Sequence, residues 1–181
     1  MDGLLFDSER IVQRSWEIAG DELGIPHMGD VIYHTLGMNR AGRNEYFRKY
    51  IREDFPFEEF GRLTRDNFWK IVDKEGLPLK KGAKELLAYG KSQGYKMAVA
   101  TSSSREYAMG NLIRAGIDSY FDSVVCGDMV KKAKPDPEIY QKACESLGIQ
   151  PEYCMAFEDA PGGILSAHQA GMQVIMVPDL V

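Results

Sequence analysis

The sequence of 181 residues predicts an α/β fold: a doubly wound parallel sheet with an inserted all-helical subdomain. Two observations predict it. After Pro78, short apolar runs alternate with segments of helical periodicity, which is typical of right-handed βαβ units. Between Pro26 and about Leu77 the pattern is helical throughout and rich in aromatic residues.

The first half of the chain is expected to contain a turn and a set of helices. Asp2-Gly3 is a strong turn dipeptide, and Asp7 or Ser8 is expected to cap a helix that ends at Gly24. Apolar residues at helical spacing predict three further helices, near Asp30–Leu36, Arg40–Ile51 and Phe57–Lys74.

The second half of the chain is expected to alternate helices with strands. The predicted helices are Gly82–Gln93, Arg105–Ala115, Pro137–Leu147 and Gly162–Ala170. The predicted strands are Lys96–Ala100, Ser123–Cys126, Cys154–Phe157 and Val174–Val177. Each helix is followed by a glycine, the residue favoured just after a helix end, and Pro137 would take the favoured first helical position.

Composition narrows the class of protein. The net charge of −5, without any long basic run, argues weakly against nucleic acid as the main partner. The three cysteines, Cys126, Cys144 and Cys154, lack a C-x-x-C spacing, which argues against a disulfide framework or a zinc site. Because no apolar run approaches the ~18 residues that span a bilayer, we expect a soluble cytoplasmic chain with no membrane contact.

Two predicted strands lead into residues suited to binding an anion. One runs into Thr101-Ser102-Ser103-Ser104, where hydroxyls and free N–H groups at a helix N-terminus would suit phosphate. A serine-rich helix cap is the better interpretation of that segment taken alone. Another strand leads to Lys134, which Pro135 and Pro137 hold on a stiff loop; a single lysine is more often solvated surface.

A third strand ends in the adjacent carboxylates Glu158 and Asp159. The carboxyl ends of parallel strands meet at one edge of a sheet, where ligands bind. Two neighbouring carboxylates are tolerable there if Mg²⁺ lies between them, because Mg²⁺ is held by one or two carboxylates with phosphate and water. A helix cap explains such a pair about equally well.

Taken together, hydroxyl, ammonium and paired carboxylates at strand ends form a set suited to phosphoryl transfer. Two unit charges interact by about 4 kcal/mol at a separation of about 4 Å and an effective dielectric constant of about 20. Several carboxylates facing a phosphate dianion therefore need Lys134 and a metal ion beside them.

These residues make the chain resemble the haloacid dehalogenase (HAD) superfamily of phosphohydrolases, in the helical-cap branch that includes β-phosphoglucomutase-like phosphatases. Asp2-Gly3 resembles the end of motif one, Asp-x-Asp-Gly, and Thr101 resembles motif two. Lys134, in Lys-Pro-Asp-Pro-Glu-Ile-Tyr, resembles motif three, and Glu158-Asp159 resembles motif four. The resemblance implies a Rossmann-like core of residues 1–10 and 78–181, with residues 11–77 as the cap.

The resemblance also implies a two-step hydrolysis through an aspartyl-phosphate. Asp2 would be the general acid and base, Thr101 would hold the phosphoryl group, and Lys134 would neutralise charge. Further phosphate or substrate contacts would be Ser102, Ser103, Gly3 and the cap residue Arg40. The Mg²⁺ ligands would be Asp2, Glu158 and Asp159.

The implied partner is a small phosphate ester such as a sugar phosphate, bound by a monomer or weak dimer. For Arg40, in Gly37-Met38-Asn39-Arg40, a second anionic or hydroxylated group is about as good an interpretation as a surface arginine.

Two departures from the family pattern qualify these expectations. The nucleophile belongs two positions before Asp2, at the end of a central strand, and the family usually continues past Val181; we therefore expect a fragment that is inactive as written. Where mutases carry a cap histidine, this chain has Val12, which favours a phosphatase over a β-phosphoglucomutase-type isomerase.

Two further alternatives remain. A signalling receiver domain would carry its acidic pair early in the chain, whereas Glu158 and Asp159 come late. The second alternative is a fragment that binds ligands without catalysing a reaction. Halide release is disfavoured because Asp2 suits phosphate ester chemistry.

Overall fold

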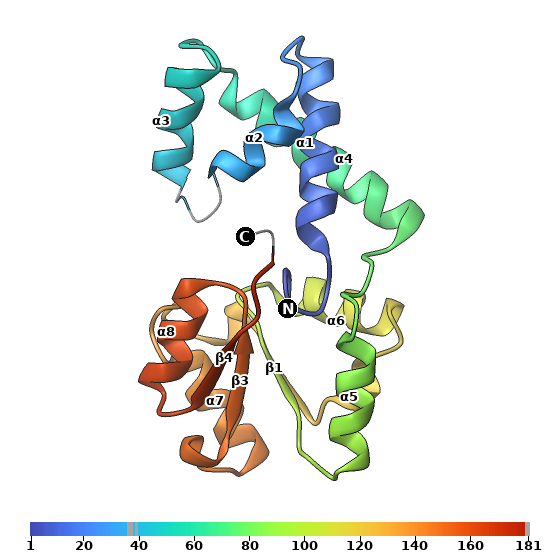
Figure 1. The fold of residues 1–181 in the computed structure, drawn as a ribbon, viewed down its shortest axis with the longest axis vertical. Coiled ribbons are helices and arrows are strands. Elements are labelled where there is room, and N and C mark those ends of the chain that lie inside the picture. Colours follow the sequence, from blue (N-terminus) through green and yellow to red (C-terminus); the bar gives the residue numbers. More distant parts are fainter. Residues whose placement is uncertain (36–37, 39, 180–181) are drawn as a thin grey trace. The chain divides into compact units, whose positions relative to one another are not determined.

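A computed structural model describes residues 1–35, 38 and 40–179, with Arg40 described by its backbone alone. The chain divides into two compact units (Figure 1). The core unit comprises Met1–Asp7 and Leu77–Asp179, and the helical unit comprises Ser8–Gly76. Each unit is described by itself below.

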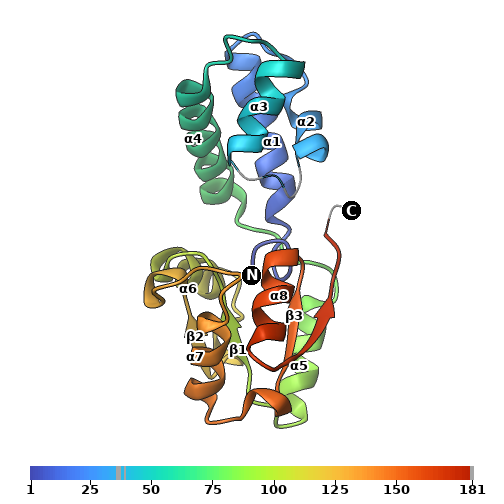
Figure 2. The ribbon, with the colours of Figure 1, turned by 90° about the vertical axis from the view of Figure 1, so that its left-hand side faces the viewer.

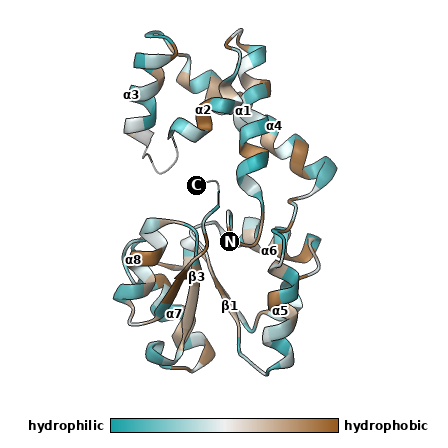
Figure 3. Cartoon of the chain, viewed as in Figure 1, coloured by the Kyte–Doolittle hydropathy of each residue, from teal (hydrophilic) through white to brown (hydrophobic). Residues whose placement is uncertain are grey.

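The described residues of the helical unit form four helices around an aromatic core. Their bounds are α1 Ser8–Glu22, α2 Met28–Thr35, α3 Arg40–Tyr50 and α4 Phe57–Glu75. Trp16 packs edge-on against Phe47 and Phe60, with ring centroids 5.5 and 5.6 Å apart. Gly20 lets α1 approach α2 closely, because a Cβ there would lie 2.7 Å from Cγ of Met28. Hydrophobic and hydrophilic residues alternate along these helices, as expected of amphipathic helices (Figure 3).

The core unit alternates helices and strands. Its helices are α5 Ala83–Ser92, α6 Arg105–Arg114, α7 Glu138–Leu147 and α8 Pro161–Gln169. Its strands are β1 Ala98–Ala100, β2 Ser123–Val125, β3 Met155–Glu158 and β4 Gln173–Met176, and short 3₁₀ turns cover residues 118–120, 127–129 and 151–153. Every predicted helix and strand is present among the described residues, and the predicted helix end at Leu36 lies outside them. The prediction for Pro137 was wrong by one position, because α7 begins at Glu138 and Pro137 is its N-cap.

Glycines stop the helices of the core unit as predicted. A glycine with positive φ follows each of them, at Gly94, Gly116, Gly148 and Gly171. The φ angles lie between 64° and 88°, a left-handed conformation in which only glycine avoids a steric cost. These glycines explain why the helix ends could be predicted from the sequence.

The strands pair in parallel, as predicted, in a mixed α/β fold. β1 pairs with β2 and β3 pairs with β4, so the described strands form two two-stranded sheets rather than one continuous sheet. Helix α7 packs on β1 and β2, α8 packs on β3 and β4, and the two helices contact each other (Figure 2). One apolar cluster lies between these elements, made of Val125, Ile139, Tyr140, Ala143, Ala156, Ala167 and Ala170.

The first seven residues form a tight loop that belongs to the core unit. The carbonyl oxygen of Met1 accepts hydrogen bonds from the amides of Leu4, Leu5 and Phe6, at 3.3, 2.8 and 3.2 Å. Phe6 is fully buried and pairs with Leu79 as an antiparallel bridge. The predicted turn at Asp2-Gly3 is thereby anchored, with Gly3 at φ +71°. In the described part of the chain, the helices are all too short or too polar to cross a bilayer.

Candidate active site

The loop between β1 and α6 carries the predicted anion-binding residues. Thr101 is buried, and its hydroxyl oxygen accepts a hydrogen bond from the Ser103 amide at 3.2 Å. As an acceptor in that bond, the hydroxyl still has its own proton to donate. Gly127 allows the loop to pack closely, because a Cβ there would overlap the carbonyl oxygen of Ser102. Ser104 caps α6 by accepting a hydrogen bond from the Tyr107 amide at 3.4 Å.

Asp2 lies against this loop. The Ser103 hydroxyl donates to Oδ2 of Asp2 at 2.9 Å, and the Tyr107 hydroxyl donates to Oδ1 at 3.0 Å. Both carboxylate oxygens are therefore held by hydroxyl donors. Tyr107 was missed from the sequence, although its place in the first turn of the helix after the serine-rich loop was a usable signal.

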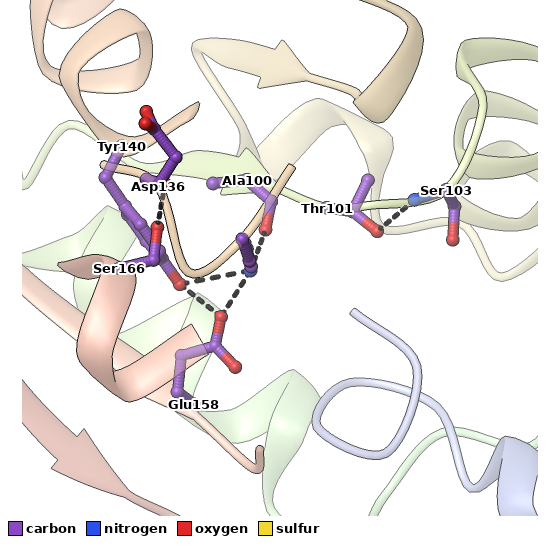
Figure 4. A network of polar contacts seen from close by, with 8 residues as sticks. Ala100, Thr101, Ser103, Asp136, Tyr140, Glu158 and Ser166 are labelled. Carbon is purple, nitrogen blue, oxygen red and sulfur yellow. Dashed lines mark hydrogen bonds and ion pairs between the residues drawn. The ribbon is translucent and has the colours of Figure 1, made fainter. Parts of the chain in front are cut away.

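Lys134 joins the end of β1 at Ala100 to the end of β3 at Glu158, two residues that Figure 4 labels. Its ammonium donates to the carbonyl oxygen of Ala100 at 3.2 Å and forms an ion pair with Glu158. The Tyr140 hydroxyl donates to the same carboxylate oxygen of Glu158 and lies 3.4 Å from Lys134 Nζ. The Tyr140 ring centroid is 4.8 Å from that ammonium. Tyr140 was not predicted as a site residue.

The environment of Glu158 favours its ionised form. Burial alone would raise the pKa of Glu158, but the charge and hydrogen bond of Lys134, with the Tyr140 hydroxyl, outweigh burial and lower it. Burial raises the pKa of Tyr140, and the neighbouring Glu158 charge raises it further, so the phenol keeps its proton. The site thus contains an ionised carboxylate beside a neutral phenol.

Helix α8 approaches Glu158 through a glycine. A Cβ on Gly163 would overlap the Glu158 carboxyl group, so a larger residue would displace it. The Ser166 hydroxyl of the same helix donates to the carbonyl oxygen of Asp136 at 2.6 Å, which ties α8 to the loop of Lys134 (Figure 4). Neither contact was predicted from the sequence.

Asp159 lies beside the turn at Gly3. A Cβ on Gly3 would overlap Oδ2 of Asp159 and would lie 3.1 Å from Oδ2 of Asp179. Burial raises the pKa of Asp159, and the Glu158 charge adds to that effect, while nearby cations oppose it. Oδ2 of Asp179 is buried and has no hydrogen-bond partner among the described residues, although Lys80 pairs with the other oxygen.

The carboxylates of Asp159 and Asp179 are candidate ligands for the predicted Mg²⁺. Within residues 1–35, 38 and 40–179, no three His, Cys, Asp or Glu side chains converge to hold a metal ion. Mg²⁺ needs only one or two carboxylates with water and substrate phosphate. Asp159 and the orphaned oxygen of Asp179 supply oxygen donors of the right kind, at a place where two negative charges repel each other. The residues present therefore fit a small divalent cation.

The predicted residues of the core unit form a continuous set of contacts. Asp2 contacts Ser103, and Ser103 contacts Thr101. Ala100, the residue before Thr101, accepts a hydrogen bond from Lys134, which forms an ion pair with Glu158. Asp159 closes the set by returning to Gly3. Ser102 belongs to the same loop, with its carbonyl against Gly127. The Arg40 side chain lies outside the described residues.

The electrostatic environment of the buried Met1 amine also shows that the predicted site residues lie close together. Burial lowers its pKa, while Asp2, Asp159 and Glu158 raise it and Lys134 lowers it through their charges. One group thus lies within electrostatic reach of four predicted site residues. The arrangement combines an anion-binding loop, a hydroxyl-held carboxylate and a cation beside paired acids.

Comparison with known proteins finds a matching family model and relatives that are named as phosphatases. The family model described as "Haloacid dehalogenase-like hydrolase" matches residues 1–177. The "Phosphorylated carbohydrates phosphatase" of Thermotoga maritima is 32% identical over 97% of this chain and 81% of its own length. "Hexitol phosphatase A" of Escherichia coli is 30% identical over 98% of this chain and 80% of its own length.

A solved structure resembles this fold closely. It is CbbY from Rhodobacter sphaeroides in complex with phosphate, which has a TM-score of 0.68 and 26% identity. The match covers 98% of this chain and 83% of CbbY.

Proposed function

Because this chain belongs to the haloacid dehalogenase-like hydrolases, we propose that it carries the phosphate, acid–base and metal residues of a Mg²⁺-dependent phosphatase for a small phosphorylated metabolite. The relatives whose names state phosphatase activity on phosphorylated carbohydrates and hexitols support a sugar phosphate as the substrate. The observation that carries the proposal is the Ser103–Asp2 hydrogen bond, since it joins an acid–base candidate to an anion-binding loop.

In this proposal, the loop after β1 holds the transferring phosphoryl group. Thr101 donates its hydroxyl proton, and Ser102 and Ser103 lie in the loop that leads to the N-terminal end of α6, where an anion is favoured. Lys134 neutralises the phosphate and the attacking carboxylate from its position between Ala100 and Glu158.

Asp2 acts as the general acid and base. It protonates the leaving oxygen of the ester and then takes a proton from the water that attacks the aspartyl-phosphate. The attacking carboxylate belongs two positions before Asp2, which lies outside the printed sequence. The P–O bond to the leaving group breaks as the bond to that carboxylate forms, and water later releases inorganic phosphate.

Mg²⁺ would be held by Asp159, by the backbone carbonyl of Asp2 and by a carboxylate oxygen of Glu158. When bound, it supplies positive charge that stabilises the phosphoryl oxygens in the transition state. Burial of Asp159 and its proximity to Asp179 support a cation at this place.

The helical unit is assigned the role of the cap that selects the substrate, with Arg40 as a candidate contact. Val12, in α1, stands where mutases carry a histidine, which supports hydrolysis over isomerisation. An assay with glucose 1-phosphate separates the two outcomes, because an isomerase would form glucose 6-phosphate and a phosphatase would release inorganic phosphate.

The test uses a chain extended upstream of Met1 to include a strand that ends in aspartate two positions before Asp2. With Mg²⁺, this chain is expected to hydrolyse p-nitrophenyl phosphate. Asp2→Asn should lower turnover by roughly 10²–10⁴-fold, the usual contribution of a general acid–base group.

Asp21→Asn, at an exposed position of α1, is the matched control and should leave turnover unchanged. Wild-type rates in Asp2→Asn would disprove the role given to Asp2. Equal rates in EDTA and in Mg²⁺ would disprove the role of the metal.

A further inference from the structure

The two hydroxyl donors that hold Asp2 differ in what else they could bind. Ser103 reaches Oδ2 from the anion-binding loop, and Tyr107 reaches Oδ1 from α6. A hydroxyl group has one proton and can donate it to one acceptor at a time. The Ser103 hydroxyl can therefore donate either to Asp2 or to an anion bound in its own loop, but not to both. Tyr107 lies in α6, after the loop residues 101–104.

Tyr107 is the more firmly positioned of the two. Its amide is held by the Ser104 cap at 3.4 Å, and its carbonyl oxygen accepts a hydrogen bond from the buried side chain of Asn111 at 2.9 Å. The first contact is with the N-cap of α6 and the second lies within the helix. Ser103 belongs instead to the loop before the helix, where its amide bonds to Thr101 and its carbonyl accepts from Gly127.

From this geometry we propose that Tyr107 is a positioning residue for Asp2, and that phosphate bound at the loop takes over the proton of the Ser103 hydroxyl. Oδ2 of Asp2 is then released on the side facing the loop, while Tyr107 keeps Oδ1 in place. The meaning of that release for catalysis rests on the proposed function, since it requires Asp2 to act as acid and base.

The exchange can be measured on the 181-residue chain without any turnover. NMR spectra with ¹³C-labelled aspartate and tyrosine report the Asp2 carboxyl carbon and the Tyr107 ring carbon that bears the hydroxyl. Inorganic phosphate is the probe. We expect phosphate to shift the Asp2 signal and to leave the Tyr107 signal in place.

Ser103→Ala tests the exchangeable partner. In this variant the Asp2 signal should already stand near its phosphate-bound position, and phosphate should move it no further. Phosphate affinity should fall about 10-fold, the effect expected for the loss of one hydrogen bond to a charged group. Ser146→Ala is the control, because that hydroxyl bonds only within α7, to Ala143.

Tyr107→Phe tests the fixed partner. The Asp2 signal should move in the absence of phosphate, and phosphate affinity should stay within about twofold of wild type, since no phosphate contact is removed. Tyr153→Phe, at an exposed tyrosine of the same unit, should leave the Asp2 signal unchanged.

Three results would overturn the inference. One is an unchanged Asp2 signal in Tyr107→Phe. Another is a Tyr107 signal that phosphate shifts as strongly as that of Asp2. The third is a lack of any phosphate effect on the amides of residues 101–104 at high millimolar phosphate.

A separate readout distinguishes this inference from the proposed function. In the upstream-extended chain, Tyr107→Phe should lower kcat and leave KM unchanged. If that chain does not hydrolyse phosphate esters while the NMR results hold, the proposed function fails and the exchange at Asp2 stands.

Discussion

Lys134 and Glu158 form an ion pair that joins the loop before α7 to the last residue of β3. Both side chains are largely withdrawn from solvent, with 14% and 7% of their surface exposed. Removing one partner of a buried pair is costly because the other charge stays buried and uncompensated. The pair is therefore expected to matter for folding as well as for chemistry.

Lys134→Met should lower the free energy of unfolding by about 3–5 kcal/mol, because it leaves the Glu158 carboxylate without its cation. Urea unfolding followed by circular dichroism measures the change. Arg62→Met is the matched control: Arg62 pairs with Glu59 and Asp66 at the surface, and exposed ion pairs contribute far less to stability than buried ones. Equal losses in the two variants would contradict the structural role of Lys134.

Gly3→Ala should destabilise the core unit and weaken Mg²⁺ binding, because the added methyl group would overlap the Asp159 carboxylate. Gly116→Ala isolates that effect. Gly116 also has positive φ, at +64°, but has open space around its Cβ direction. Backbone strain of about 1 kcal/mol is common to both variants, so a larger loss in Gly3→Ala reports the Asp159 contact. Thermal unfolding with and without Mg²⁺ measures both.

Mg²⁺ should stabilise the wild-type chain, since a ligand that binds only the folded state adds about 2.7 kcal/mol at a concentration of about 100 Kd. Asp159→Asn should lose most of this gain. Calorimetric melting in EDTA and in Mg²⁺ measures it, and Asp118→Asn, in a 3₁₀ turn of the core unit, serves as the control. An undiminished Mg²⁺ effect in Asp159→Asn would remove Asp159 from the metal site.

Glu138 should titrate far below an ordinary glutamate. Hydrogen bonds from the Lys131 amide, with further contributions from Lys142 and the Lys132 amide, lower the pKa of Glu138 to about 2. A lowered pKa in the folded state means that this contribution to stability is present above the ordinary value near 4.5. It is lost as the pH falls from there through about 2.

An NMR titration of the Glu138 carboxyl carbon measures the midpoint directly. In Glu138→Gln, the part of the stability loss that occurs between pH 4.5 and 2 should be smaller than in the wild type. An ordinary midpoint for Glu138 would show that the two amides do not hold the carboxylate in solution.

Phe47→Ala should destabilise the helical unit by about 3–5 kcal/mol, the usual cost of removing a large buried aromatic side chain. Phe47 is 2% exposed and contacts the rings of Trp16, Phe55, Phe57 and Phe60. Tyr50→Ala, at a residue that is 60% exposed in the same helix, should cost far less. Tryptophan fluorescence during urea unfolding follows this unit, because Trp16 and Trp69 both belong to it.

The sequence predicted the elements well because glycine and proline mark their ends. Gly94, Gly116, Gly148 and Gly171 stop four helices through local backbone geometry, which needs no tertiary information. Strand pairing is different. The apolar runs of β1 and β3 identify strands but not their neighbours, so the sequence could not show that the strands form two separate sheets.

The candidate site was predictable where a residue ends a strand or follows it directly. Thr101, Glu158 and Asp159 were found that way, and their roles stay predictions. Tyr107 and Tyr140 were missed because their hydroxyls reach Asp2 and Glu158 across the fold, over separations of 105 and 18 residues. No periodicity encodes such contacts.

The pairing of the strands has a consequence for the width of the site. In a continuous sheet, backbone hydrogen bonds keep neighbouring strands about 4.8 Å apart. The described strands β1 and β3 share no such ladder, and the ammonium of Lys134 links Ala100 to Glu158 instead. The length of the Lys134 side chain thus sets the distance between the hydroxyls that follow β1 and the acids at the end of β3. A lysine analogue with a shorter side chain would draw these two strand ends closer together.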